Sequence, residues 1–200
     1  MLCVMGVLKT QKGLIIKERI SAYLNKYFES IFYVEQDPPG VLFEYPAILC
    51  TLKMAIDMNE PVLYIHTKGA ADPYKMWYQK PVKKLWQQEF GTDKVIETYK
   101  KVCIDEPTVI CPIAGIKKQT WWNAFIINPA AAKIILPTLK HPSVLKDKCV
   151  SPNSRYYYES FMCNLPNINV ISSAVACSCS ENLTNKLLLE LTKNLPDIDY

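Results

Sequence analysis

The first 66 residues alternate between two apolar patterns, and this alternation limits the possible folds more than any other feature of the sequence. Short apolar runs at 2–8, 31–34 and 62–65 predict strands. Between them, residues 17–28 and 45–58 carry apolar side chains spaced three and four apart, which predicts helices. Strands that alternate with helices form parallel sheets with right-handed crossovers. We therefore expect an α/β fold of three layers, with helices on both faces of a largely parallel central sheet.

The second half of the sequence continues this scheme with longer connections. Residues 72–90 predict a loop that enters a helix. No internal repeat or linker divides the chain, so we expect one domain over residues 1–200 that ends with a helix at about 180–195. The other predicted elements are strands at 107–113 and 169–174, and helices at 93–102, 129–136 and 155–163.

Composition narrows the classes of protein that this chain can represent. A net charge of +4 is mild, and the sequence lacks the basic stripe of nucleic-acid-binding proteins, so we expect no nucleic-acid partner. No apolar run approaches the roughly 18 residues that a membrane span needs, so we expect no membrane-spanning segment. Four of the cysteines lie in apolar runs and no cysteine pair has zinc spacing, which indicates a reduced, cytoplasmic protein. These four are Cys3, Cys50, Cys103 and Cys111.

A polar motif follows the third predicted strand. His66, Thr67, Lys68 and Gly69 come directly after the apolar run at 62–65. Ligands of open α/β sheets bind beyond the carboxyl ends of the strands. There Lys68 can neutralise a phosphate, Gly69 lets backbone N–H groups approach it, and His66 can orient it. A histidine at a strand end is also often a structural hydrogen-bonding residue, and this alternative stays open.

Two adjacent tryptophans mark a second candidate segment. Trp121 and Trp122 lie within an apolar stretch at 120–127, which is read as a strand. Adjacent residues of a strand point to opposite faces, so one indole can pack in the core while the other faces a cleft. An exposed indole suits stacking on a sugar ring or a base. The alternative is that both tryptophans belong to the core.

An arginine and a glutamate form the third candidate. Arg155 and Glu159 lie four residues apart, so they share a face if residues 155–163 are helical. In a cleft, Arg155 would orient an anionic group and Glu159 would accept a proton from a hydroxyl as general base. The alternative is an ordinary surface ion pair. Asp197 and Asp199 form an Asp-x-Asp in the last residues, a poor place for a metal site, so no metal ligands are assigned.

Together these segments resemble a family of predicted glycosyltransferases from bacterial polysaccharide gene clusters and large viruses. That family carries a strand ending in His-Thr-Lys-Gly, a later Trp, an aromatic Trp-Trp-Ala-type segment and an Arg-Tyr…Glu segment. The matching residues of this chain, in the same order, are His66 to Gly69, Trp86, Trp121 to Ala124, and Arg155 to Glu159.

The resemblance implies a nucleotide-diphospho-sugar-binding fold of the GT-A type and transfer of a sugar from a nucleotide-sugar donor to a hydroxyl of a carbohydrate acceptor. The resemblance also implies a role in the synthesis of cell-surface polysaccharide, with the enzyme located in the cytoplasm. His66, Lys68, Gly69 and Arg155 would bind the donor, Trp121 or Trp122 would stack on the sugar, and Glu159 would be the catalytic base. Many enzymes of this fold use manganese or magnesium, so a divalent cation is a candidate cofactor.

Two departures from the family pattern favour an alternative. Lys118 and Gln119 replace the Gly-Asn that precedes the aromatic segment, and no Asp-x-Asp follows an internal strand. A non-catalytic carbohydrate- or nucleotide-binding domain derived from such an enzyme would tolerate both changes. Another α/β activity, such as phosphate-ester hydrolysis, lacks support because no Gly-x-Ser-x-Gly motif occurs.

Overall fold

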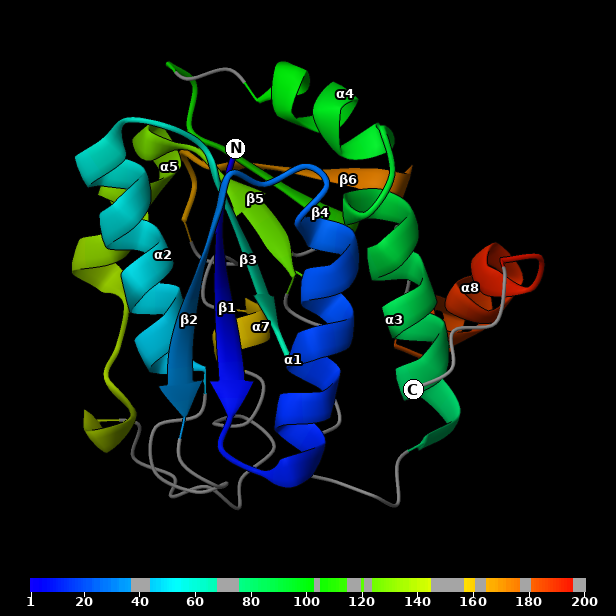
Figure 1. Cartoon of the computed structure of the whole chain (residues 1–200). Coiled ribbons are helices and arrows are strands. Elements are labelled where there is room, and N and C mark those ends of the chain that lie inside the picture. Colours follow the sequence, from blue (N-terminus) through cyan, green and yellow to red (C-terminus); the bar gives the residue numbers. More distant parts are fainter. Residues whose placement is uncertain are drawn as a thin grey trace.

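The protein is described from a computed structural model (Figure 1). The description covers backbone and fold at residues 1–36, 44–67, 76–102, 105–114, 120, 124–144, 157–160, 165–176 and 181–195. Within these ranges, side chains are left out at 36, 76–79, 144, 159–160, 175–176 and 181–185.

One six-stranded sheet forms the centre of the molecule, with the strand order β2-β1-β3-β5-β4-β6. Neighbouring strands run parallel except at β5, which is antiparallel to both β3 and β4. The predicted α/β fold with a largely parallel sheet is therefore confirmed. The strands are β1 (Leu2–Leu8), β2 (Ser30–Gln36), β3 (Val62–His66), β4 (Thr108–Ala114), β5 (Phe125–Ile127) and β6 (Asn169–Ala176).

Helices cover both faces of the sheet (Figure 1). Pro46 lies in the first turn of α2, where its missing N–H costs no hydrogen bond, and α2 has the predicted bounds. Helix α1 begins earlier than predicted because Thr10 caps it, with Oγ1 accepting from the Gly13 N–H at 3.0 Å. The helices are α1 (Gln11–Leu24), α2 (Tyr45–Met58), α3 (Met76–Phe90), α4 (Lys94–Lys101), α5 (Pro129–Ile135), α7 (Tyr157–Ser160) and α8 (Glu181–Thr192), with short 3₁₀ turns at Leu136–Thr138 and Pro142–Val144.

The hydrophobic core consists of two clusters, one on each face of the sheet. Side chains of β3 alternate between them, as the pleat of a strand requires. Leu63 and Ile65 pack with α1 and α3, whereas Val62 and Tyr64 pack with α2 and α5. No helix in the described part of the chain is long and apolar enough to cross a bilayer.

The order of the strands reverses beside β1. The chain steps from β1 to β2 on one side and then returns past β1 to β3 on the other. Because parallel crossovers are right-handed, this reversal puts α1 and α2 on opposite faces of the sheet. The carboxyl ends of β1 and β3 meet at this reversal, where Gly6 pairs with His66. Such a switch point is where open α/β sheets bind ligands.

Candidate functional site

His66 is the last residue of β3 and lies at the switch point, as the sequence predicts for the carboxyl edge. Its side chain is almost fully buried, with 8% of the residue exposed. The Nε2 atom lies 3.4 Å from Oε1 of Glu44, the residue that precedes α2. A carboxylate at a helix N-terminus also interacts favourably with the helix dipole. Glu44 therefore fixes the imidazole and is itself stabilised from two directions.

Aromatic rings hold the other sides of this imidazole. Tyr64 lies nearly parallel to His66, with ring centroids 6.0 Å apart and an angle of 7°. Trp86 from α3 packs at 5.5 Å and 59°. Trp86 is fully buried, and its Nε1 has no hydrogen-bond partner among the described residues. The tryptophan of the predicted motif thus supports the histidine from within the core.

Thr67 joins the two strands of the switch point. Its N–H donates to the Gly6 carbonyl at 3.0 Å, and its Oγ1 accepts from the Leu8 N–H at 3.0 Å. Beyond Leu8 the chain turns tightly into α1. The turn leaves room only for glycine at position 13, because a Cβ on Gly13 would lie 2.1 Å from the Leu8 carbonyl oxygen. The threonine of the motif therefore has a structural role that the sequence did not indicate.

A second aromatic group lies at the beginning of α2, beside Glu44. Tyr45 packs against His141 at 4.9 Å and against Tyr158 of α7 at 6.3 Å. The Tyr158 hydroxyl donates to the Lys140 carbonyl at 3.0 Å. Burial raises the pKa of Tyr158, and Glu44 is one of the negative groups that raise it further. This contact brings the chain that follows Arg155 to the same end of α2 as His66.

The described structure includes only part of the predicted site. Lys68, Gly69, Trp121, Trp122 and Arg155 lie outside the described residues. Glu159 belongs to α7, but its side chain is not described, and Asp197 and Asp199 also lie outside.

The described neighbours of the missing segments do converge. Phe125 follows the tryptophan pair, pairs with Tyr64 in the sheet and packs on its ring at 5.1 Å. Tyr158 follows Arg155 and packs beside Glu44. Two segments that are distant in the sequence therefore reach the part of the fold that contains His66.

A buried cation on α3 was not predicted. Lys83 is only 5% exposed, and α3 packs against α1. Burial, together with the charges of Lys12 and Arg19 on α1, lowers the pKa of Lys83 to about 8. Helical periodicity cannot show that α1 and α3 become neighbours, so no sequence signal pointed to this group.

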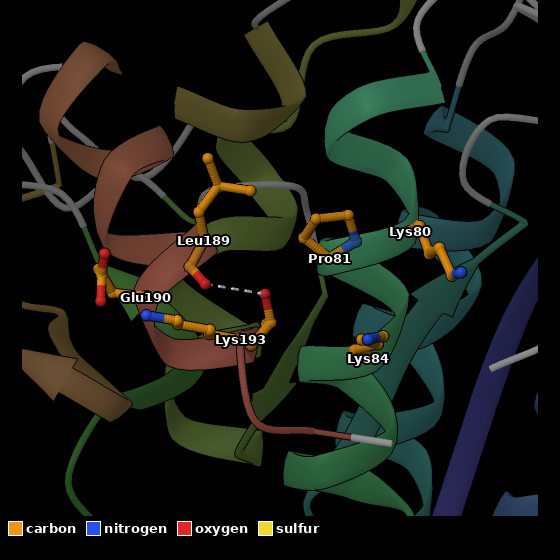
Figure 2. A pocket seen from close by; sticks show the side chains of 7 residues that line it. Lys80, Pro81, Lys84, Leu189, Glu190 and Lys193 are labelled. Carbon is orange, nitrogen blue, oxygen red and sulfur yellow. Dashed lines mark hydrogen bonds between the residues drawn. The ribbon is translucent and has the colours of Figure 1, made fainter. Parts of the chain in front are cut away.

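A cavity of about 390 Å³ opens elsewhere, between α3 and α8 (Figure 2). Leu189 and Pro81 face each other across it, while the Lys80 side chain extends away from α8. Lys84 donates from Nζ to the Leu195 carbonyl at 3.1 Å. His66, the predicted site residue whose side chain the structure describes, does not line this cavity, and the lysines drawn in Figure 2 do not converge on one point.

No protein-family model, curated protein or solved structure matches this chain. The family likeness therefore stays a prediction. Within the described ranges, no group of three or more His, Cys, Asp or Glu side chains is placed to hold a metal ion. Of the cysteines expected in the core, Cys3 and Cys111 are buried free thiols and Cys50 is a partly buried one, whereas Cys103 lies outside the described residues.

Proposed function

We propose that this protein is a glycosyltransferase with a GT-A-like fold, which moves a sugar from a nucleotide-sugar to a hydroxyl group of a carbohydrate acceptor. The observation that carries the proposal is the position of His66. A titratable ring, fixed by Glu44, ends β3 at the reversal of strand order, where α/β sheets bind nucleotides. The same proposal includes a role in the synthesis of cell-surface polysaccharide and a location of the enzyme in the cytoplasm.

The proposed chemistry is a single substitution at the anomeric carbon. The acceptor oxygen forms a bond to that carbon, the bond to the diphosphate breaks, and the acceptor proton passes to a base. Glu159 is the proposed base, and Lys68 and Arg155 would stabilise the charge on the departing diphosphate. Trp121 or Trp122 would stack on the sugar.

His66 would orient the donor in this scheme, together with the Gly69 backbone. Glu44 lies beside Nε2 and so fixes the orientation in which the ring would meet the donor. Manganese or magnesium would lower the charge of the diphosphate where it binds. Among the described residues Glu44 and His66 are paired with each other, so they are not assigned as metal ligands and no step is routed through a metal.

The test is calorimetry with a panel of nucleotide-sugars, with and without manganese. We expect one donor to bind, and His66→Asn and Glu44→Gln each to weaken binding by about tenfold, the effect of one charged hydrogen bond. Glu29→Gln is the matched control, because Glu29 pairs with the Met1 amino group at 3.4 Å at the start of β2. Absence of binding at millimolar donor, in both conditions, would contradict the proposal.

One observation favours a non-catalytic carbohydrate- or nucleotide-binding domain as the second candidate. His66 is nearly buried and ion-paired, which also describes a histidine with a structural role. Turnover separates the two functions. Donor binding without sugar transfer to any acceptor and without donor hydrolysis would support the binding domain.

A further inference from the structure

Among the strands that the structure describes, β2 forms one edge of the sheet. Residues Ser30–Gln36 pair with β1 through seven successive positions without a bulge. Within the described residues, β2 pairs with no other strand. The sequence of β2 contains no Pro, Gly or Lys, and Glu35 is its single charged residue. Natural edge strands are normally blunted by such residues or by bulges, because a regular edge is a template for pairing with another chain.

The opposite edge of the sheet is different. Strand β6 pairs with β4 through a register shift between Cys111 and Ile113. A shift of this kind twists an edge and interrupts pairing. Two serines, Ser172 and Ser173, occupy its centre. Of the two edges, β2 is therefore the one that can accept a further strand along its whole length.

Large apolar side chains surround the β2 edge. Phe32 is 43% exposed and Tyr33 is 42% exposed, and they lie on opposite faces of the sheet. The Tyr33 hydroxyl shares a hydrogen bond with Ser21 Oγ at 3.0 Å, which holds the ring beside α1. Lys17 lies over one face of this ring, 4.1 Å from its centre. Leu14, 44% exposed and one turn before Lys17, extends the apolar surface along α1.

The sequence of β2 fits a second copy of itself. In an antiparallel pair centred on Tyr33, Ser30 lies opposite Gln36, Ile31 opposite Glu35, and Phe32 opposite Val34. No two like charges face each other, and the two Glu35 carboxylates are separated by about 13 Å along the strands. A symmetric contact of this kind uses the same edge of both copies and closes at two subunits.

We propose that β2 is the interface of a homodimer, in which the β2 strands of two copies pair antiparallel about Tyr33 and join the two sheets. The partner is a second copy of this chain. Dimerisation is independent of sugar transfer, and it places the two Tyr33 side chains together on the two-fold axis.

The test uses charge at this axis, with the mass in solution read by light scattering over a concentration series. We expect the unmodified chain to approach twice the monomer mass. Tyr33→Lys and Tyr33→Glu should each be monomeric, because like charges meet at the axis. An equal mixture of the two variants should recover the dimer, because Lys then faces Glu. Tyr33→Phe controls for the lost hydroxyl and should remain dimeric.

The other edge supplies the second control. Ile171→Lys places a charge at an exposed position of β6 and should leave the dimer unchanged. The proposal is wrong if the unmodified chain stays monomeric at all concentrations, or if Ile171→Lys dissociates the dimer while the Tyr33 variants do not. It is equally wrong if the mixture of Lys and Glu variants fails to associate although both remain folded by circular dichroism.

Discussion

Helix α3 carries two buried charged residues in contrasting environments. Near the C-terminal end, Glu89 is 1% exposed and has two partners from different elements. Ser173 of β6 donates to its Oε2 at 2.6 Å, and Lys94 at the beginning of α4 donates to Oε1. Near the middle, Lys83 is buried beside two further cations, Lys12 and Arg19.

This difference separates a structural charge from an electrostatically strained one. A buried charge is tolerated when opposite charges and hydrogen bonds replace its lost hydration. Glu89 meets that condition and ties together α3, α4 and β6. For Lys83, burial and then the charges of Lys12 and Arg19 lower the pKa, so its protonated form is less favoured in the folded chain than in the unfolded chain. Strain of this kind is more typical of functional regions than of structural ones.

Removing Glu89 should give the largest loss of stability. Glu89→Ala deletes two charge-assisted hydrogen bonds and leaves the Ser173 hydroxyl without its acceptor. We expect a loss of about 3 kcal/mol in the free energy of unfolding, measured by urea denaturation. Glu97→Ala, on the exposed side of α4, should change it by less than about 0.5 kcal/mol. If Glu89→Ala and Glu97→Ala lower the free energy of unfolding equally, the buried network around Glu89 contributes no more stability than an exposed glutamate does.

Removing the charge of Lys83 should instead increase the free energy of unfolding. Met has a similar length and no charge, so Lys83→Met relieves the desolvation and the repulsion by Lys12 and Arg19. We expect a gain of about 2 kcal/mol at pH 7. Lys101→Met, at an exposed lysine of α4, should leave stability unchanged within about 0.5 kcal/mol. A loss of stability in Lys83→Met would mean that the ammonium has a favourable environment.

The pH dependence of stability follows from the same shift. The folded-state pKa of Lys83 is about 8, below the ordinary value of 10.5. Between these values the unfolded chain binds more protons than the folded chain, so this group increases stability as pH rises. Below pH 8 its full cost is present. The difference in unfolding free energy between Lys83→Met and the unmodified chain should therefore shrink from pH 7 to pH 10. A constant difference would contradict the lowered pKa.

Local patterns were sufficient for several elements of the fold. Strand β1 and helix α2 have the predicted bounds, because an apolar run and a Pro at the first turn mark them within a few residues. The start of α1 was wrong because the apolar stripe begins later than the helix, whose first turn is set by the Thr10 cap. Strand β5 is shorter than the predicted stretch at 120–127, and Thr120 forms an isolated bridge to Ala114.

The candidate site was predictable only in part. His66 lies where the strand pattern placed it, because strand ends are local features. Its partner Glu44 was missed, since their contact depends on α2 crossing to the face opposite α1. Lys83 was missed for the same reason, because only the packing of α3 on α1 brings it near Lys12 and Arg19. Pairings of this kind come from topology, which periodicity does not encode.

The smallest expected effect divides the Glu89 network into its two partners. Ser173→Ala removes one hydrogen bond and leaves the bond to Lys94 in place. Because Lys94 still pairs with the Glu89 carboxylate in this variant, we expect the free energy of unfolding to fall by about 1.5 kcal/mol in urea denaturation, half the effect of Glu89→Ala. In the double variant the second substitution should cost almost nothing, since its partner is already gone. Additive losses would show that Ser173 contributes through its packing on β6, and Glu89 would then depend on Lys94 alone for compensation.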